Sequence, residues 1–203
     1  MSKKLLISFF ILFFIYSVSY TAITPKEQIK KGVDSVISIL KDPKYKGKEK
    51  IHQRRAALRA EIGKFFDFDE MSKRALGIYW KERTPQEKKE FVELFKDLLE
   101  RSYAEKIESY TDEEILYTDE FIENSKYATV KTKIITKERK DIPIDYRLYF
   151  NGKEWKVYDV LIEGVSLVSN YRSQFNKIIR VHSYQELIKR MKAKQLEEKI
   201  RER

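Results

Sequence analysis

The stretch that most constrains the fold is residues 142–175, in which the spacing of the apolar side chains changes along the chain. Residues 142–150 alternate between apolar and polar side chains, which is typical of a half-buried strand. The apolar face of this strand consists of Ile142, Ile144, Tyr146, Leu148 and Phe150. Asn151 and Gly152 then predict a hairpin, because both residues tolerate positive φ.

A second strand, residues 154–162, returns from this hairpin and ends before Gly164. Simple alternation places Trp155 and Val157 on one face and, on the other face, Tyr158, Val160 and Ile162. Beyond Gly164 the apolar residues are three or four positions apart, which predicts a helix over residues 165–181. A wide apolar hairpin followed at once by a helix can form a packed core. With large residues and an opening it can also enclose a cavity.

Helix start signals organise the N-terminal half of the chain. Thr24 and Glu27 form a capping box around Pro25, and residues 84–87 repeat the pattern. Together with the apolar spacing, these signals predict helices over residues 25–40, 49–63, 70–76, 85–109 and 184–200, and further strands over residues 114–118 and 127–136. Helices followed by a run of strands indicate an α+β fold with an antiparallel meander.

Residues 1–22 resemble a signal peptide. Lys3 and Lys4 precede an uncharged apolar run that is short for a membrane span, and small residues near Ala22 offer cleavage sites. An uncleaved membrane anchor is the alternative, and in both cases the rest of the chain lies outside the cytoplasm. We expect residues 23–203 to form one domain, with a helical part over 23–110 and the sheet and last helices over 111–203.

The charge balance admits several partners. The chain carries 42 basic and 32 acidic residues, a net charge of +10, and no cysteine. A basic surface fits nucleic acid, anionic lipid headgroups or an acidic partner protein, and equally a solvated surface without a partner. Export and the scattered placement of the basic residues argue against nucleic acid. Without cysteine, disulfides and thiolate metal sites are excluded.

Few residues offer reaction chemistry. His52 and His182 stand in different helical regions, with no carboxylate at ligand spacing, so we expect no metal site. Asp145 and Asp159 lie on predicted strands and could act as an acid/base pair in a cone-shaped sheet. The alternative, which we favour, is that each caps a turn or pairs with a basic neighbour such as Arg147 or Arg172.

Two long blocks occur in an order typical of one protein family. They are FDFDEMSKRALGIYWKERTPQEKKEFVELFKDLLERSY (residues 66–103) and WKVYDVLIEGVSLVSNYRSQF (residues 155–175). Both resemble the MlaC family of periplasmic phospholipid-binding proteins, also described as toluene-tolerance or ABC-transporter auxiliary proteins. The resemblance extends over nearly the whole chain after the N-terminal segment, and residues 41–64 and the tail beyond Met191 are its least specific parts.

The resemblance implies a carrier without catalysis and without a cofactor other than its bound phospholipid. Such a protein would be a periplasmic monomer that shuttles phospholipid and maintains outer-membrane lipid asymmetry. Its partners would be an outer-membrane lipoprotein–porin complex and an inner-membrane complex of an MCE protein with an ABC transporter. The implied fold is a curved antiparallel sheet, similar to the cone of nuclear-transport-factor-two-like proteins, covered by helices that enclose an apolar lipid cavity.

The apolar faces found above supply the expected lining of that cavity. The lining residues are Phe91, Phe95, Leu98, Val130, Ile134, Ile144, Tyr146, Leu148, Trp155, Val157, Val160 and Ile162. Residues expected to close it near its mouth are Val165, Leu167, Tyr171 and Phe175. Arg147 and Arg172 are candidate contacts for the headgroup or a partner. Two alternatives stay open: an exported enzyme with Asp145 or Asp159 as its base, and an interaction module with a filled core.

Overall fold

The computed structural model describes residues 23–201, so the predicted signal peptide over residues 1–22 lies outside the described residues. Within this range six α-helices and five strands follow one another along the chain. They are α1 (Pro25–Lys41), α2 (Ile51–Phe65), α3 (Phe68–Leu76), α4 (Pro85–Glu108), β1 (Glu114–Glu123), β2 (Tyr127–Ile135), β3 (Asp141–Phe150), β4 (Trp155–Ile162), β5 (Val165–Ser166), α5 (Leu167–Val181) and α6 (Tyr184–Arg201). Short 3₁₀ turns, η1 (Pro43–Tyr45), η2 (Lys48–Lys50) and η3 (Gly77–Glu82), connect the helices.

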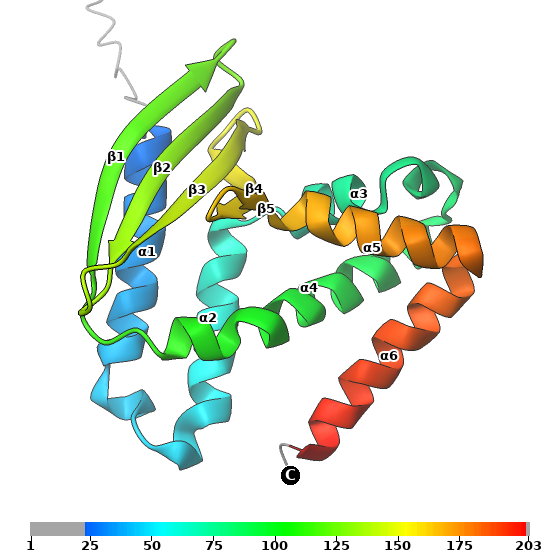
Figure 1. Cartoon of the computed structure of the whole chain (residues 1–203), viewed down its shortest axis with the longest axis horizontal. Coiled ribbons are helices and arrows are strands. Elements are labelled where there is room, and N and C mark those ends of the chain that lie inside the picture. The colour runs from blue at the N-terminus through cyan, green and yellow to red at the C-terminus, as the bar shows by residue number, and fades with distance from the viewer. Residues whose placement is uncertain (1–22, 202–203) are drawn as a thin grey trace, which may run out of the picture.

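The strands form one antiparallel meander in the order β1-β2-β3-β4-β5, which confirms the predicted α+β class. The sheet is curved and unclosed, and α1 runs alongside it while α5 and α6 lead away (Figure 1). Both predicted capping boxes are present, at the starts of α1 and α4.

Strand β1 is longer than the predicted residues 114–118. A bulge between Tyr117 and Asp119 interrupts the alternation that marks a strand in sequence. The strand then continues to a tight turn in which Asn124 and Ser125 both have positive φ, at 49° and 52°. Two positive φ values are typical of a type I′ turn, here closed by the Lys126 N–H donating to the Glu123 carbonyl at 3.1 Å, although the sequence lacks the glycine that usually signals one.

A second irregularity changes which residues of β4 share a face. Leu148 of β3 lies opposite Val157, whereas the preceding Arg147 lies opposite Asp159, so Tyr158 is an extra residue in the ladder. Val157 and Val160 therefore both join the inner cluster of the sheet. The prediction that they occupy opposite faces was wrong, because simple alternation does not anticipate the bulge.

Helix α5 begins at Leu167, two residues later than the predicted start at residue 165. Val165 and Ser166 form β5, which pairs back onto Ile162 and Leu161. The Ser166 hydroxyl then accepts a hydrogen bond from the Ser169 N–H at 3.0 Å and caps α5. Val165 and Ser166 thus form a short strand where the first two helical residues were predicted.

The buried side chains form two clusters. The helical cluster is built from α3, α4, α5 and α6, and the inner-face cluster lies between α1 and the sheet. Phe66 packs against both clusters, since its backbone forms an isolated bridge with Val157 of β4. Next to it, Asp67 donates its N–H to the Val157 carbonyl at 2.9 Å, and its carboxylate accepts hydrogen bonds from Tyr149 and from the Glu70 N–H. This joint fixes the helical cluster to the sheet.

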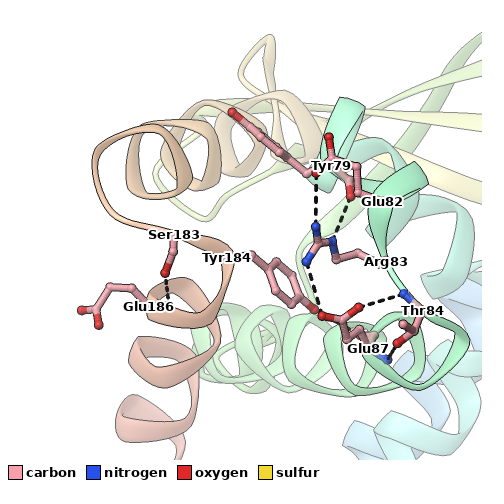
Figure 2. A network of polar contacts seen from close by, with 8 residues as sticks. All are labelled: Tyr79, Glu82, Arg83, Thr84, Glu87, Ser183, Tyr184 and Glu186. Carbon is pink, nitrogen blue, oxygen red and sulfur yellow. Dashed lines mark hydrogen bonds and ion pairs between the residues drawn. The ribbon is translucent and has the colours of Figure 1, made fainter.

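The start of α6 is held against α4 by a polar network. Figure 2 shows Arg83 reaching the Tyr79 carbonyl and the carboxylates of Glu82 and Glu87, at 3.2 to 3.3 Å. The Arg83 guanidinium also lies over the Tyr184 ring, 4.5 Å from its centroid, and the Tyr184 hydroxyl donates to the Glu87 carbonyl. The network therefore orients α6 so that its apolar side chains complete the helical cluster.

Helices α1 and α2 approach each other closely at Gly32. A Cβ at this position would lie 3.0 Å from Cγ of Phe65, a buried ring on α2. Only a residue without a side chain lets this ring pack directly against the α1 backbone.

We expect Gly32→Ala to lower the free energy of unfolding by about 1–2 kcal/mol, because overpacking against Phe65 outweighs the gain in helix propensity. Gly63 on α2 is the matched control, since a Cβ there would meet nothing within 4 Å. Gly63→Ala should raise stability by about 0.5–1 kcal/mol. Urea denaturation of both variants measures the difference, and equal shifts would contradict the close packing at Gly32.

Candidate functional site

The inner face of the sheet is tightly packed at one end. Leu148 of β3 lies between Ala128 of β2 and Val157 of β4, and all three are almost fully buried. Ile29, in the first half of α1, covers this end, and Trp155 closes it from β4. These residues form an ordinary filled core.

The other end of the same face is only half covered. Its apolar side chains lie on the same side as Val130 and Leu148 and stay partly accessible to solvent, around the buried Thr132. They are Tyr117 of β1, Ile134 of β2, Ile142, Ile144 and Tyr146 of β3, and Ile162 of β4. We call these six residues the half-covered face. Apolar side chains on the concave side of a sheet are normally removed from water, so this partial exposure needs an explanation.

Helix α1 loses its close contact with the sheet in the same direction. Its buried residues Gln28, Ile29 and Gly32 all lie in its first half. The apolar residues that follow are half-buried, namely Val33, Val36, Ile37, Ile39 and Leu40. The backbone N–H of Lys26 donates to Glu120 near the far end of β1, and Lys41 pairs with Asp112 just before β1 begins. Helix α1 therefore spans both ends of the face, but it packs against one.

Two tyrosines stand in the half-covered face. Burial raises the pKa of the Tyr146 hydroxyl to about 12, although part of the side chain is accessible to solvent. Burial also raises the pKa of Tyr117, and the neighbouring Tyr146, Asp34 and Tyr110 raise it further. The Tyr117 hydroxyl oxygen is buried and has no hydrogen-bond partner among the described residues.

The helical residues predicted to line the cavity lie elsewhere. The Phe175 ring packs edge to face against Phe91 and Phe95, with centroids 5.6 and 5.5 Å away, and Tyr171 packs against Phe95 at 5.3 Å. All four rings are buried inside the helical cluster, and Leu98 is partly buried against it. The structure therefore separates these residues from the sheet's inner face.

The predicted residues from the sheet do come together. The inner-face cluster contains Val130, Ile144, Tyr146, Leu148, Trp155, Val157, Val160, Ile162 and Leu167. Ile134 lies on the same face of β2, opposite Ile142 of β3. Val165 stands apart from them in β5, and its side chain is 58% exposed.

The predicted lining omitted several members of the inner-face cluster, among them Ile29 and Val33 of α1 and Tyr117 of β1. The apolar stripe of α1 was visible in its helical spacing, but spacing does not reveal which surface a helix covers. Tyr117 lies within the predicted strand over residues 114–118, but the bulge after it interrupts the alternation that would show which face it occupies.

The two predicted headgroup contacts lie outside the half-covered face. Arg147 alternates with Tyr146 and Leu148 and so occupies the opposite face of β3, where its Nη1 is 3.4 Å from Asp159. Arg172 is exposed on α5 and donates from Nε to the Arg74 carbonyl at 2.6 Å. Both positions remain open to an external partner.

Asp159, one of the two candidate bases, is almost fully buried and bonded on several sides. Its carboxylate accepts hydrogen bonds from the Ser166 hydroxyl at 2.6 Å and from the Val168 N–H at 3.1 Å, besides facing Arg147. These contacts hold the start of α5 against β4, and they give the carboxylate a structural role. Asp145 is half-buried on β3, opposite Leu161.

Two surface grooves lie between helices, away from the sheet. One, of about 550 Å³, has basic residues of α2 such as Arg55 and Arg59 on its walls and Lys96 and Glu100 of α4 opposite. The other, of about 440 Å³, lies between α4 and α6. Within residues 23–201 no group of three or more histidine, cysteine or acidic side chains is placed to hold a metal ion. None of the helices in this range combines the length and hydropathy needed to cross a bilayer.

Comparison with known proteins places the chain among related sequences over most of its length. The family described as MlaC protein matches residues 30–193. The toluene tolerance protein ttg2D of Pseudomonas putida is 26% identical over 159 residues, which cover 78% of this chain and 74% of that protein. The intermembrane phospholipid transport system binding protein MlaC of Haemophilus influenzae is 24% identical over 186 residues, or 87% of this chain and 86% of that protein.

A solved structure shares the fold. It is a phospholipid-binding protein from Ralstonia solanacearum in complex with a phospholipid, and it is 24% identical in sequence. The match has a TM-score of 0.75 and covers 85% of this chain and 97% of that one. The curved sheet with its covering helices is therefore an arrangement that a second sequence also adopts.

We expect Asp159→Asn to lower the free energy of unfolding by about 1–3 kcal/mol, because it weakens charge-assisted bonds at a buried position. Asp145→Asn is the matched control on the neighbouring strand and should change stability by less than about 0.5 kcal/mol. Chemical denaturation measures both. A stable Asp159→Asn variant would show that the carboxylate is not needed to hold α5, and would reopen its interpretation as a base.

Proposed function

The chain belongs to the MlaC protein family, and from this premise we propose that it binds a phospholipid at the half-covered face and carries it between two membranes. The observation that carries the proposal is the change along one apolar surface, from filled core around Leu148 to partly exposed side chains around Ile144. A protein that only needed a stable core would gain by covering both ends.

The energetics of a lipid in water support an apolar face of this kind. Each CH₂ group of an acyl chain that enters water costs about 0.8 kcal/mol. Two chains of ordinary length therefore amount to roughly 20 kcal/mol, so a carrier must replace most of the burial that the membrane provided. The isoleucines of the half-covered face can supply such contacts without polar groups that would need partners. A carrier of this kind requires no catalytic step.

The names of the relatives support phospholipid as the ligand. The Haemophilus influenzae relative is described as the binding protein of an intermembrane phospholipid transport system, and the Ralstonia solanacearum structure holds a phospholipid. By analogy we assign this chain to the periplasm, with residues 1–22 as its export signal. It would receive and deliver lipid at an outer-membrane lipoprotein–porin complex and an inner-membrane MCE-protein and ABC-transporter complex.

The direct test is native mass spectrometry of protein purified without detergent from a diderm bacterium, followed by solvent extraction. We expect a near-stoichiometric phospholipid that survives washing. Folded protein with a clean apo mass, which also fails to take up phospholipid from vesicles, would overturn the proposal.

Filling the half-covered face should weaken lipid binding. We expect Ile144→Trp to reduce phospholipid affinity about tenfold, since displacing about two CH₂ groups costs about 1.6 kcal/mol. Thr129→Trp is the matched control, because Thr129 lies on the opposite face of the adjacent strand, across from Arg147. Displacement of a fluorescent phospholipid measures both affinities, and circular dichroism verifies the fold. Equal affinities would place the lipid elsewhere.

A further inference from the structure

The half-covered face contains one polar atom that the protein leaves without a partner. The Tyr117 hydroxyl oxygen is buried and makes no hydrogen bond within residues 23–201. A buried hydroxyl without a partner costs about 1–3 kcal/mol, so proteins seldom retain one unless another molecule completes the bond.

A second tyrosine stands on the same face, on the other side of β2. Tyr117 pairs with Thr132 of β2, and Tyr146 on β3 pairs with Val130, one inward position further along the same strand. Tyr146 is also among the groups that raise the pKa of Tyr117. Thr132, which lies opposite Tyr117, donates its hydroxyl to the Ile144 carbonyl at 2.8 Å and does not pair with the Tyr117 hydroxyl. The two tyrosines thus form a pair of donors on an otherwise apolar surface.

The charges around this pair decide which acceptor it suits. Asp34 is the acidic side chain among the groups that raise the pKa of Tyr117, so a negative charge lies near this hydroxyl. A phosphate group would be repelled there, whereas a neutral carbonyl oxygen would not. The neutral acceptors of a phospholipid are its ester carbonyls, which lie between the charged headgroup and the acyl chains.

We propose that Tyr117 and Tyr146 donate hydrogen bonds to an ester carbonyl of the bound lipid and so fix how deeply its acyl chains enter. The idea rests on the proposed function, because it assigns a chemical role to two residues of the same lipid-binding face. It implies that the protein distinguishes ester-linked from ether-linked lipids, since an ether oxygen is a weaker acceptor and lacks the carbonyl. It also implies that both hydroxyls, rather than the ring surfaces alone, contribute to binding.

The experiment compares two lipids with the same headgroup and chain length, dipalmitoyl phosphatidylglycerol and its dihexadecyl ether analogue. Each displaces a fluorescent phospholipid from the purified wild type and from Tyr117→Phe, Tyr146→Phe and the double variant. Tyr127→Phe is the matched control, because Tyr127 packs against Tyr158 on the outer side of the sheet. Phenylalanine keeps the ring, and removing an unpartnered hydroxyl should leave the stability of the lipid-free protein unchanged or higher.

We expect the wild type and Tyr127→Phe to prefer the diester by about three- to tenfold, the range for one or two neutral hydrogen bonds. The double variant should bind both lipids equally, at the affinity of wild type for the diether. If wild type binds the two lipids equally, or if the double variant keeps the preference, the inference is overturned while the carrier function stands. If wild type binds neither lipid, both the inference and the proposed function fail.

Discussion

A curved sheet presents an apolar concave surface that something must cover, and in this protein a single helix is too narrow to do so. Helix α1 crosses the face of β1 and β2 but packs tightly only where Ile29 meets Val130 and Leu148. Helices α3, α4 and α6 pack into the helical cluster, as does most of α5, and α2 packs against α1 through Phe65, so none of them fills the gap. The isoleucines are partly exposed because too few helices cover this end of the sheet. They give the folded protein an accessible apolar surface.

Two carboxylates join the helical cluster to the sheet. Asp67 connects the start of α3 to the carbonyl of Val157 and to Tyr149. Asp159 connects β4 to the start of α5 through Ser166 and the Val168 N–H. Both act where a strand and a helix meet, and together they hold the starts of α3 and α5 against β4. Asp159 thereby has a structural role that accounts for its burial.

Much of the architecture was predictable because local chemistry decides it. Thr24 and Thr84 start helices through side-chain bonds within a few residues, and the alternation of residues 142–150 marks a strand by itself. The two bulges, after Tyr117 and at Tyr158, were not predictable, since they depend on the partner strand. Nor could apolar spacing separate Phe91 and Phe95, which lie in a closed helical core, from Ile144 and Tyr146, which lie in the open face. That distinction depends on which helices cover which surface, information that no single element contains.

Two hydrophobic clusters joined at Phe66 also need not open together. Aromatic rings pack inside the helical cluster, and the Arg83 network fixes α6 to it. Helix α1 has few buried residues, and all of them lie in its first half. Regions with few buried contacts open at a lower free energy than the global unfolding of the chain. Amide hydrogens in the second half of α1 would therefore exchange with solvent faster than those of α4 and α5. Such local opening would let a ligand leave sideways from the sheet while the rest of the fold stays intact.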